Sequence, residues 1–123
     1  MLYLRFAGFD RDERTLCSVG MFQIAYGLLR SELDSYVRVE LRSCIRWLEE
    51  NVMVPTRLYR PGRRRYAISW FQPGARSEIA MARRLVTAIE EAGVPVRTMR
   101  TATPGFVVYR DAKQVVAVPF QTC

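Results

Sequence analysis

The spacing of hydrophobic residues changes several times along the chain, and each change marks a predicted helix or strand. Residues 2–6 form a short apolar and aromatic segment before Gly8, a pattern typical of a strand. From about Asp12, apolar residues recur at intervals of three or four, which predicts a helix with one buried face. That predicted face consists of Leu16, Val19, Phe22, Tyr26 and Leu29. Because Gly20 and Gly27 lie inside this segment, we expect close packing or a break in the helix there.

A second helix is predicted directly after the first. Ser31 and Asp34 form a variant of the capping box, in which a serine is followed by an acid three residues later, and the helix should end near Asn51. Its apolar face consists of Leu33, Val37, Leu41, Cys44, Ile45 and Leu48. Two amphipathic helices with almost no spacer pack as an antiparallel hairpin or form one bent rod, and we favour the hairpin.

The second half of the chain combines one clear helix with short strands. Residues 66–71 are aromatic and β-branched, which predicts a strand. The side chains on one face of this strand are Tyr66, Ile68 and Trp70. Residues 75–92 have a helical pattern, and Gly93 is placed to cap its end. The apolar face of that helix consists of Ile79, Ala82, Leu85, Val86 and Ile89. Short connections then indicate an antiparallel meander of three strands at residues 96–100, 106–110 and 114–118.

The order of these segments predicts the fold class. A strand, a helix and a strand over residues 66–100 allow a right-handed crossover that lays the helix on the sheet. Pro119 removes a backbone donor, so the last strand should lie at an edge of the sheet or end before this proline. We therefore predict a single domain over residues 1–123 with an α+β fold. It is a two-layer sandwich of about five mostly antiparallel strands, with three helices mainly on one face.

Composition and the start of the chain indicate a cytoplasmic protein. Half of the residues are hydrophobic and a quarter are charged, which is typical of ordered globular domains. Arg5 interrupts the first apolar segment, unlike a secretory signal, and no apolar run approaches the roughly 18 residues of a membrane helix. The three cysteines, Cys17, Cys44 and Cys123, are odd in number and widely spaced, so we expect reduced thiols. Cys17 and Cys44 should be small core residues, and Cys123 should be exposed.

No catalytic, metal-binding or cofactor-binding residues are predicted. The chain has no histidine, no phosphate loop of the G-x-x-x-x-G-K-[ST] type and no G-x-G-x-x-G. The acids at Asp10, Asp12 and Glu13 are compatible with a hard cation, but a polar loop before a helix explains them more simply. A small enzyme acting on a phosphorylated or anionic substrate stays open, because such sites use residues scattered in sequence.

The strongest feature of the sequence is its basic charge. The net charge is +7, and residues 57–65 contain five arginines and no acid. We predict that this stretch contacts a partner through Arg57, Arg60, Arg63, Arg64, Arg65 and Tyr59. Possible extensions, if the strands bring them onto the same surface, are Arg97, Arg100 and Arg110.

Three interpretations of this arginine stretch are open. An acidic protein partner is our preferred one, and nucleic acid is the alternative, with the adjacent aromatics stacking on bases. The third is a solvated loop whose arginines contribute little. An unblocked strand edge also allows a homodimer.

The segments Ala67-Ile-Ser-Trp-Phe71, Thr103-Pro-Gly-Phe-Val-Val-Tyr109 and Gln114-Val-Val-Ala-Val-Pro-Phe120 resemble a group of small uncharacterised bacterial proteins. The resemblance covers about residues 65–120. It implies a bacterial cytosolic protein of unknown function and carries no reaction, cofactor or catalytic residue.

Overall fold

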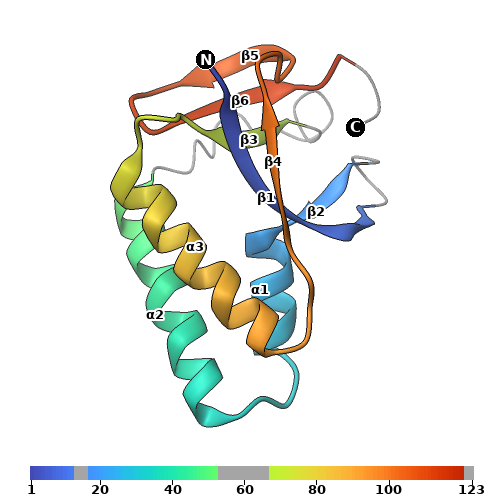
Figure 1. Ribbon diagram of the computed structural model, residues 1–123, viewed down its shortest axis with the longest axis vertical. Helices are drawn as coiled ribbons and strands as arrows, with labels where there is room; N and C mark the ends of the chain where they lie inside the picture. The colour runs from blue at the N-terminus through green and yellow to red at the C-terminus, as the bar shows by residue number, and fades with distance from the viewer. Residues whose placement is uncertain (13–16, 53–66, 121–123) are drawn as a thin grey trace.

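The computed structural model describes residues 1–12, 17–52 and 67–120, and these ranges form six strands and three helices. The strands are β1 (Tyr3–Arg11), β2 (Ser18–Gly20), β3 (Ile68–Phe71), β4 (Arg97–Thr101), β5 (Phe106–Arg110) and β6 (Gln114–Val118). The helices are α1 (Met21–Leu29), α2 (Ser35–Asn51) and α3 (Arg76–Glu91). They form the predicted two-layer α+β sandwich, with the helices on one side of the sheet (Figure 1). None of the helices in the described ranges is long and apolar enough to cross a membrane.

Every strand pair in the sheet is antiparallel. The strand order is β2-β1-β3-β6-β5. β2 and β3 pair with one edge of β1, and β4 pairs with the opposite edge. Leu4 of β1 is aligned with Phe71 on one side and with Arg100 on the other. Since β3 and β4 are both antiparallel to β1, they run parallel to each other, and α3 makes the expected crossover between them. β6 lies inside the sheet and ends at Val118, directly before Pro119.

The predicted meander is correct for β5 and β6, which form a hairpin, but wrong for β4. β4 pairs with β1, five residues against five, and not with β5. The crossover through α3 carries the chain from β3 past β1 to the far side of β1, and that placement depends on long-range contacts. Connection length alone did not determine it.

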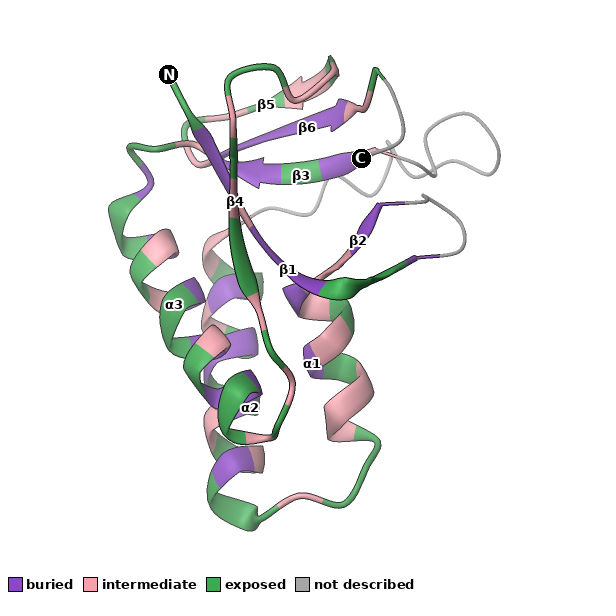
Figure 2. Cartoon of the chain, turned by 45° about the vertical axis from the view of Figure 1, so that its right-hand side comes forward, coloured by how far each residue is buried: buried purple, intermediate pink, exposed green. Residues whose placement is uncertain are grey.

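Alternation along the strands separates two buried clusters. Leu4 and Phe6 point toward the helices and pack with fully buried side chains of α2 and α3. Those helical residues include Leu41, Leu48, Leu85 and Ile89. Each contributes about 1.5–3 kcal/mol by leaving water. The opposite face of the sheet carries a second cluster of Tyr3, Ile68, Trp70 and Val115. Figure 2 shows buried residues along β1, β3 and β6 and on the inner faces of the helices.

The first helix begins later than its hydrophobic spacing predicted. Val19 belongs to β2, which pairs with β1, and α1 begins only at Met21 after an extended Gly20. The buried positions of α1 are Met21 and Ala25, while Tyr26 is 41% exposed, so the predicted face is rotated by about one position. Ser18 and Gly20 pair with Arg11 and Ala7 of β1, and that pairing outweighs the local helical pattern.

The second helix begins at Ser35, and Ser31 ends the first helix instead of capping the second. Ser31 Oγ donates to the Leu28 carbonyl at 2.7 Å. Arg38 Nη1 donates to the Leu29 carbonyl at 2.8 Å, and Arg38 Nη2 donates to the Ser31 carbonyl at 2.7 Å. These bonds satisfy carbonyls that the end of α1 leaves without helical partners. α1 and α2 form the expected antiparallel hairpin (Figure 1).

The cysteines agree with the sequence prediction only in part. Cys44 is buried and free, as expected for a small core residue. Cys17 is also buried but is disulfide-bonded, so the prediction of reduced thiols is wrong for this residue. Wide spacing along the chain did not exclude a disulfide, because the fold sets the distance between two sulfur atoms.

Candidate anion-binding face of the sheet

The predicted contact set lies outside the described residues. This applies to all of its members, Arg57, Tyr59, Arg60, Arg63, Arg64 and Arg65. The described strands bring other arginines together, on the face of the sheet that points away from the helices.

Arg5 and Arg97 are diagonal neighbours on this face. In the β1–β4 pair, Arg5 is aligned with Met99 and Ala7 with Arg97. Residues two apart on a strand share a face, so the side chains of Arg5 and Arg97 both lie opposite the helix-facing Leu4. Arg5 was not predicted to be a site residue, although an arginine between two apolar neighbours in a strand was a visible signal.

Neutral groups hold both guanidinium groups in place. Arg5 Nη2 donates to the Ser18 carbonyl at 2.5 Å, and Arg97 Nη2 donates to Ser18 Oγ. Arg5 Nη1 lies 3.9 Å from Met99 Sδ. The guanidinium of Arg97 also lies over the ring of Phe9, 5.3 Å from its centroid. Ser18 of β2 therefore positions an arginine from β1 and an arginine from β4.

The Arg5–Arg97 pair carries an excess of positive charge. Burial lowers the pKa of Arg5, the charge of Arg97 lowers it further, and Asp12 partly opposes the change. Arginine stays charged at neutral pH despite such a shift. Neither Arg5 nor Arg97 forms a salt bridge with a carboxylate of the described residues. The pair therefore offers charged donors that an added anion can neutralise.

The suggested extensions divide between the two faces. Arg110 of β5 is aligned with Val115, and its guanidinium lies 5.9 Å from the ring centroid of Tyr3, on the face of Arg5. Arg100 is three residues from Arg97 and is aligned with Leu4, so it lies on the helix side of β4. Arg97 and Arg110 therefore share a face, and Arg100 does not.

A buried donor without a partner lies on the same face. Trp70 is buried, and its Nε1 has no hydrogen-bond acceptor. Because Leu4 is aligned with Phe71, the next residues along this antiparallel pair are Arg5 and Trp70, on the opposite face. An unsatisfied buried donor costs about 1–3 kcal/mol. This side of the sheet is thus rich in donors.

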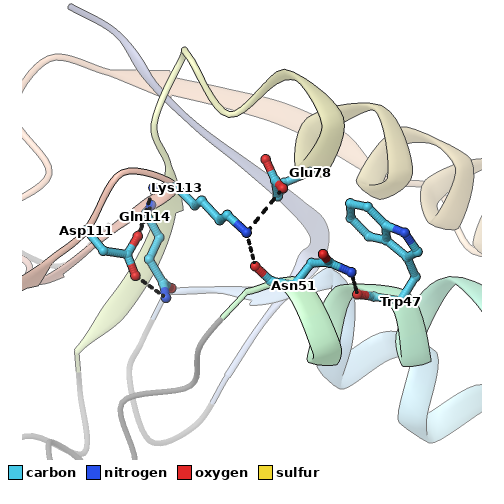
Figure 3. Close-up of polar contacts among 6 residues, drawn as sticks. All are labelled: Trp47, Asn51, Glu78, Asp111, Lys113 and Gln114. Carbon is cyan, nitrogen blue, oxygen red and sulfur yellow. Dashed lines mark hydrogen bonds and ion pairs between the residues drawn. The ribbon is translucent and has the colours of Figure 1, made fainter.

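The acidic side chains near the β5–β6 turn form hydrogen bonds and an ion pair within the protein. Glu78 in the first turn of α3 lies 3.5 Å from Lys113 Nζ, which also donates to the Asn51 carbonyl at 2.5 Å (Figure 3). Asp111 accepts hydrogen bonds from the backbone N–H groups of Lys113 and Gln114 at 2.8 and 2.9 Å. Burial alone would raise the pKa of Asp111, but these and other hydrogen bonds lower it below its usual value. The contacts of Lys113 tie the β5–β6 hairpin to α2 and α3.

A shallow hollow between α2 and α3 is the other candidate. It is lined by Tyr36, Glu40, Arg84, Thr87, Ala88 and Glu91. Arg84 and Glu40 form a 2.5 Å salt bridge, and Cys44 Sγ lies 3.5 Å from the same carboxylate. Two of the three charged side chains that line this hollow are therefore paired with each other. The described residues contain no cluster of three or more metal-ligating side chains.

A comparison of the chain with protein-family models, curated proteins and solved structures finds no match. The resemblance to small uncharacterised bacterial proteins therefore stays an expectation from the sequence.

Proposed function

We propose that the protein is a non-enzymatic interaction module that binds an acidic protein partner. The observation that carries this proposal is the Arg5–Arg97 pair, which is held by Ser18, forms no salt bridge among the described residues and is only partly compensated by the charge of Asp12. Carboxylates of a partner supply the missing charge, and the planar guanidinium group suits their geometry. The arginines of residues 57–65 add charge of the same sign.

An acidic protein explains the face better than single-stranded nucleic acid. Binding of single strands relies on aromatic rings whose faces are free for stacking with bases. Arg97 covers one face of the Phe9 ring, and Tyr3 is buried beneath Arg110. One face of the Phe9 ring and the ring of Tyr3 are therefore less available for stacking with bases.

The proposal is tested by titrating the protein with a fluorescent glutamate-rich peptide and with a single-stranded oligonucleotide of equal net charge. The peptide should bind more tightly, and Arg97→Ser should weaken it about tenfold, the effect of losing a charge-assisted hydrogen bond of about 1.5 kcal/mol. Arg46→Ser is the matched control, because Arg46 is an exposed arginine on α2.

Two results would favour the other interpretations. Tighter binding of the oligonucleotide, with a steep loss of affinity as salt increases, would support a nucleic-acid-binding protein. Turnover of a phosphate ester or another anionic substrate by the purified chain, abolished by Arg97→Ser, would support a small enzyme.

A further inference from the structure

Within the part of the chain that the structure describes, no strand pairs with the outer edge of β4. Among the described residues, β4 pairs with β1 alone, through five successive residue pairs without a register shift. It contains no proline between Arg97 and Thr101. Every second backbone N–H and C=O of such a strand points outward, and unpaired groups of this kind are a template for an added strand.

The other terminal strands of the sheet are less suitable. β2 has only three residues, Ser18–Gly20. β5 shifts register against β6 between Val107 and Tyr109, which is the mark of a β-bulge. Bulges at an edge bend the strand and interrupt pairing. An added strand therefore finds better geometry at β4.

The charges at β4 determine what kind of strand fits. Arg97 and Arg100 are exposed and, three positions apart, project to opposite faces of the sheet. Arg5 lies beside Arg97 on one of these faces. An added strand alternates in the same way, so two acidic residues three positions apart would meet Arg97 and Arg100 at once.

The guanidinium of Arg97 is held on the inner side of β4, by Ser18 Oγ of β2 and the Phe9 ring of β1. To meet an acid at the outer edge of β4, Arg97 exchanges these neutral contacts for a carboxylate. A charge-assisted hydrogen bond to a carboxylate is the stronger contact.

A second copy of the chain is a poorer occupant than an acidic strand. Pairing of two β4 edges would bring Arg97 and Arg100 of both copies together, and β4 contains no acid to compensate. Like charges on neighbouring strands repel each other. Charge complementarity therefore favours a partner with acidic residues.

We propose that an extended acidic segment of the partner protein adds to the sheet as a strand at the outer edge of β4, with two acids three residues apart facing Arg97 and Arg100. This inference rests on the proposed function and specifies how the partner binds.

The test compares two peptides of identical composition, built from β-branched residues and two glutamates. One has the glutamates three positions apart, and the other has them two positions apart. The first should bind several-fold more tightly, and Arg97→Ser and Arg100→Ser should each remove that preference, while Arg46→Ser should keep it. Binding should also slow amide hydrogen exchange of the outward N–H groups of β4 at least tenfold.

Peptides with N-methylated backbones provide a second measurement. One peptide carries N-methyl groups on its odd-numbered residues and the other on its even-numbered residues. Only one of the two should lose binding, because the N–H groups of alternate residues point to opposite edges of the added strand and only one edge pairs with β4.

The outcomes separate the mode of binding from the function. Equal affinity of the two peptides, with β4 amides still unprotected, would end the strand-addition proposal and leave the acidic-partner function intact. Failure of both peptides and of the glutamate-rich peptide to bind would end both proposals. Protection of β4 amides that depends on protein concentration, without any peptide, would overturn the inference in favour of a second copy.

Discussion

Lys113 Nζ donates a 2.5 Å hydrogen bond to the backbone carbonyl of Asn51, which joins the β5–β6 turn to the last turn of α2. The same ammonium lies 3.5 Å from Glu78 in the first turn of α3. Lys113 is the only lysine in the sequence. Its compact charge reaches both a helix C-terminal carbonyl, where cations are favourable, and a carboxylate. Three elements that are far apart in sequence thus meet at one side chain.

Replacing Lys113 by methionine should lower the free energy of unfolding by about 1–2 kcal/mol. The variant loses a charge-assisted hydrogen bond and leaves the buried Glu78 without its cation. Urea denaturation should show a lower midpoint with an unchanged m-value. Since the side chain of Lys113 is 40% exposed, we expect the lower part of this range.

A double-mutant cycle with Glu78→Gln measures how far Lys113 and Glu78 depend on each other. Residues in one polar network should show a coupling energy of at least about 0.5 kcal/mol. Additive effects of the two substitutions would mean that the Asn51 carbonyl alone accounts for the role of Lys113.

Gly105, directly before β5, is predicted not to tolerate a side chain. Its φ is +130°, and a Cβ at this position would lie 2.0 Å from the Val118 carbonyl oxygen. Gly105→Ala should therefore destabilise the protein by at least about 2 kcal/mol, through backbone strain and displacement of the end of β6. Gly74→Ala is the matched control, because a Cβ there meets no atom within 4 Å. Equal thermal midpoints for the two variants would contradict this prediction.

The fold was predictable wherever local pattern and tertiary packing agree. The apolar faces of α2 and α3 were predicted from periodicity, because amphipathic helices keep one side toward the core whatever their neighbours are. The start of α1 was not, since Val19 has helical spacing but pairs as part of β2. The partner of β4 was also missed, because strand order depends on contacts between distant segments.

The sequence predicted only that the candidate site would be positively charged. The excess of arginine is visible in the sequence, and Arg97 was named as a possible extension. That Arg97 lies beside Arg5 depends on the register of β1 against β4, in which Ala7 faces Arg97. A shift of one residue would have placed Arg97 on the other face of the sheet. No local pattern fixes that register.

The arginines of residues 57–65 provide a prediction of their own. Replacing Arg63, Arg64 and Arg65 by serine should weaken binding of the glutamate-rich peptide while changing the thermal midpoint little. We expect these arginines at the surface, and surface substitutions usually change stability by less than about 0.5 kcal/mol. Anisotropy titration and thermal denaturation of the same samples check both parts. Unchanged affinity would remove these arginines from the contact surface.

Tyr26 connects α1 to α2, and its ionisation should lower the stability of the protein at alkaline pH. Its hydroxyl donates a hydrogen bond to the Glu49 carboxylate. Burial, followed by this hydrogen bond and the charge of Glu49, raises the pKa of Tyr26 from 10.0 to about 12. The native protein therefore holds this proton at pH values where the unfolded chain has released it.

The contribution of Tyr26 to stability should be complete below pH 10 and should disappear as the pH rises to about 12. The free energy of unfolding should fall more steeply over this range in the wild type than in Tyr26→Phe, which has no hydroxyl to ionise. Chemical denaturation of both proteins at a series of pH values measures the difference, and the comparison removes the contribution of Cys44, whose raised pKa of about 11 is common to both. Absorbance of tyrosinate in the wild type should show one late-titrating tyrosine that the variant lacks. Parallel pH profiles would mean that the Tyr26–Glu49 contact does not persist in solution.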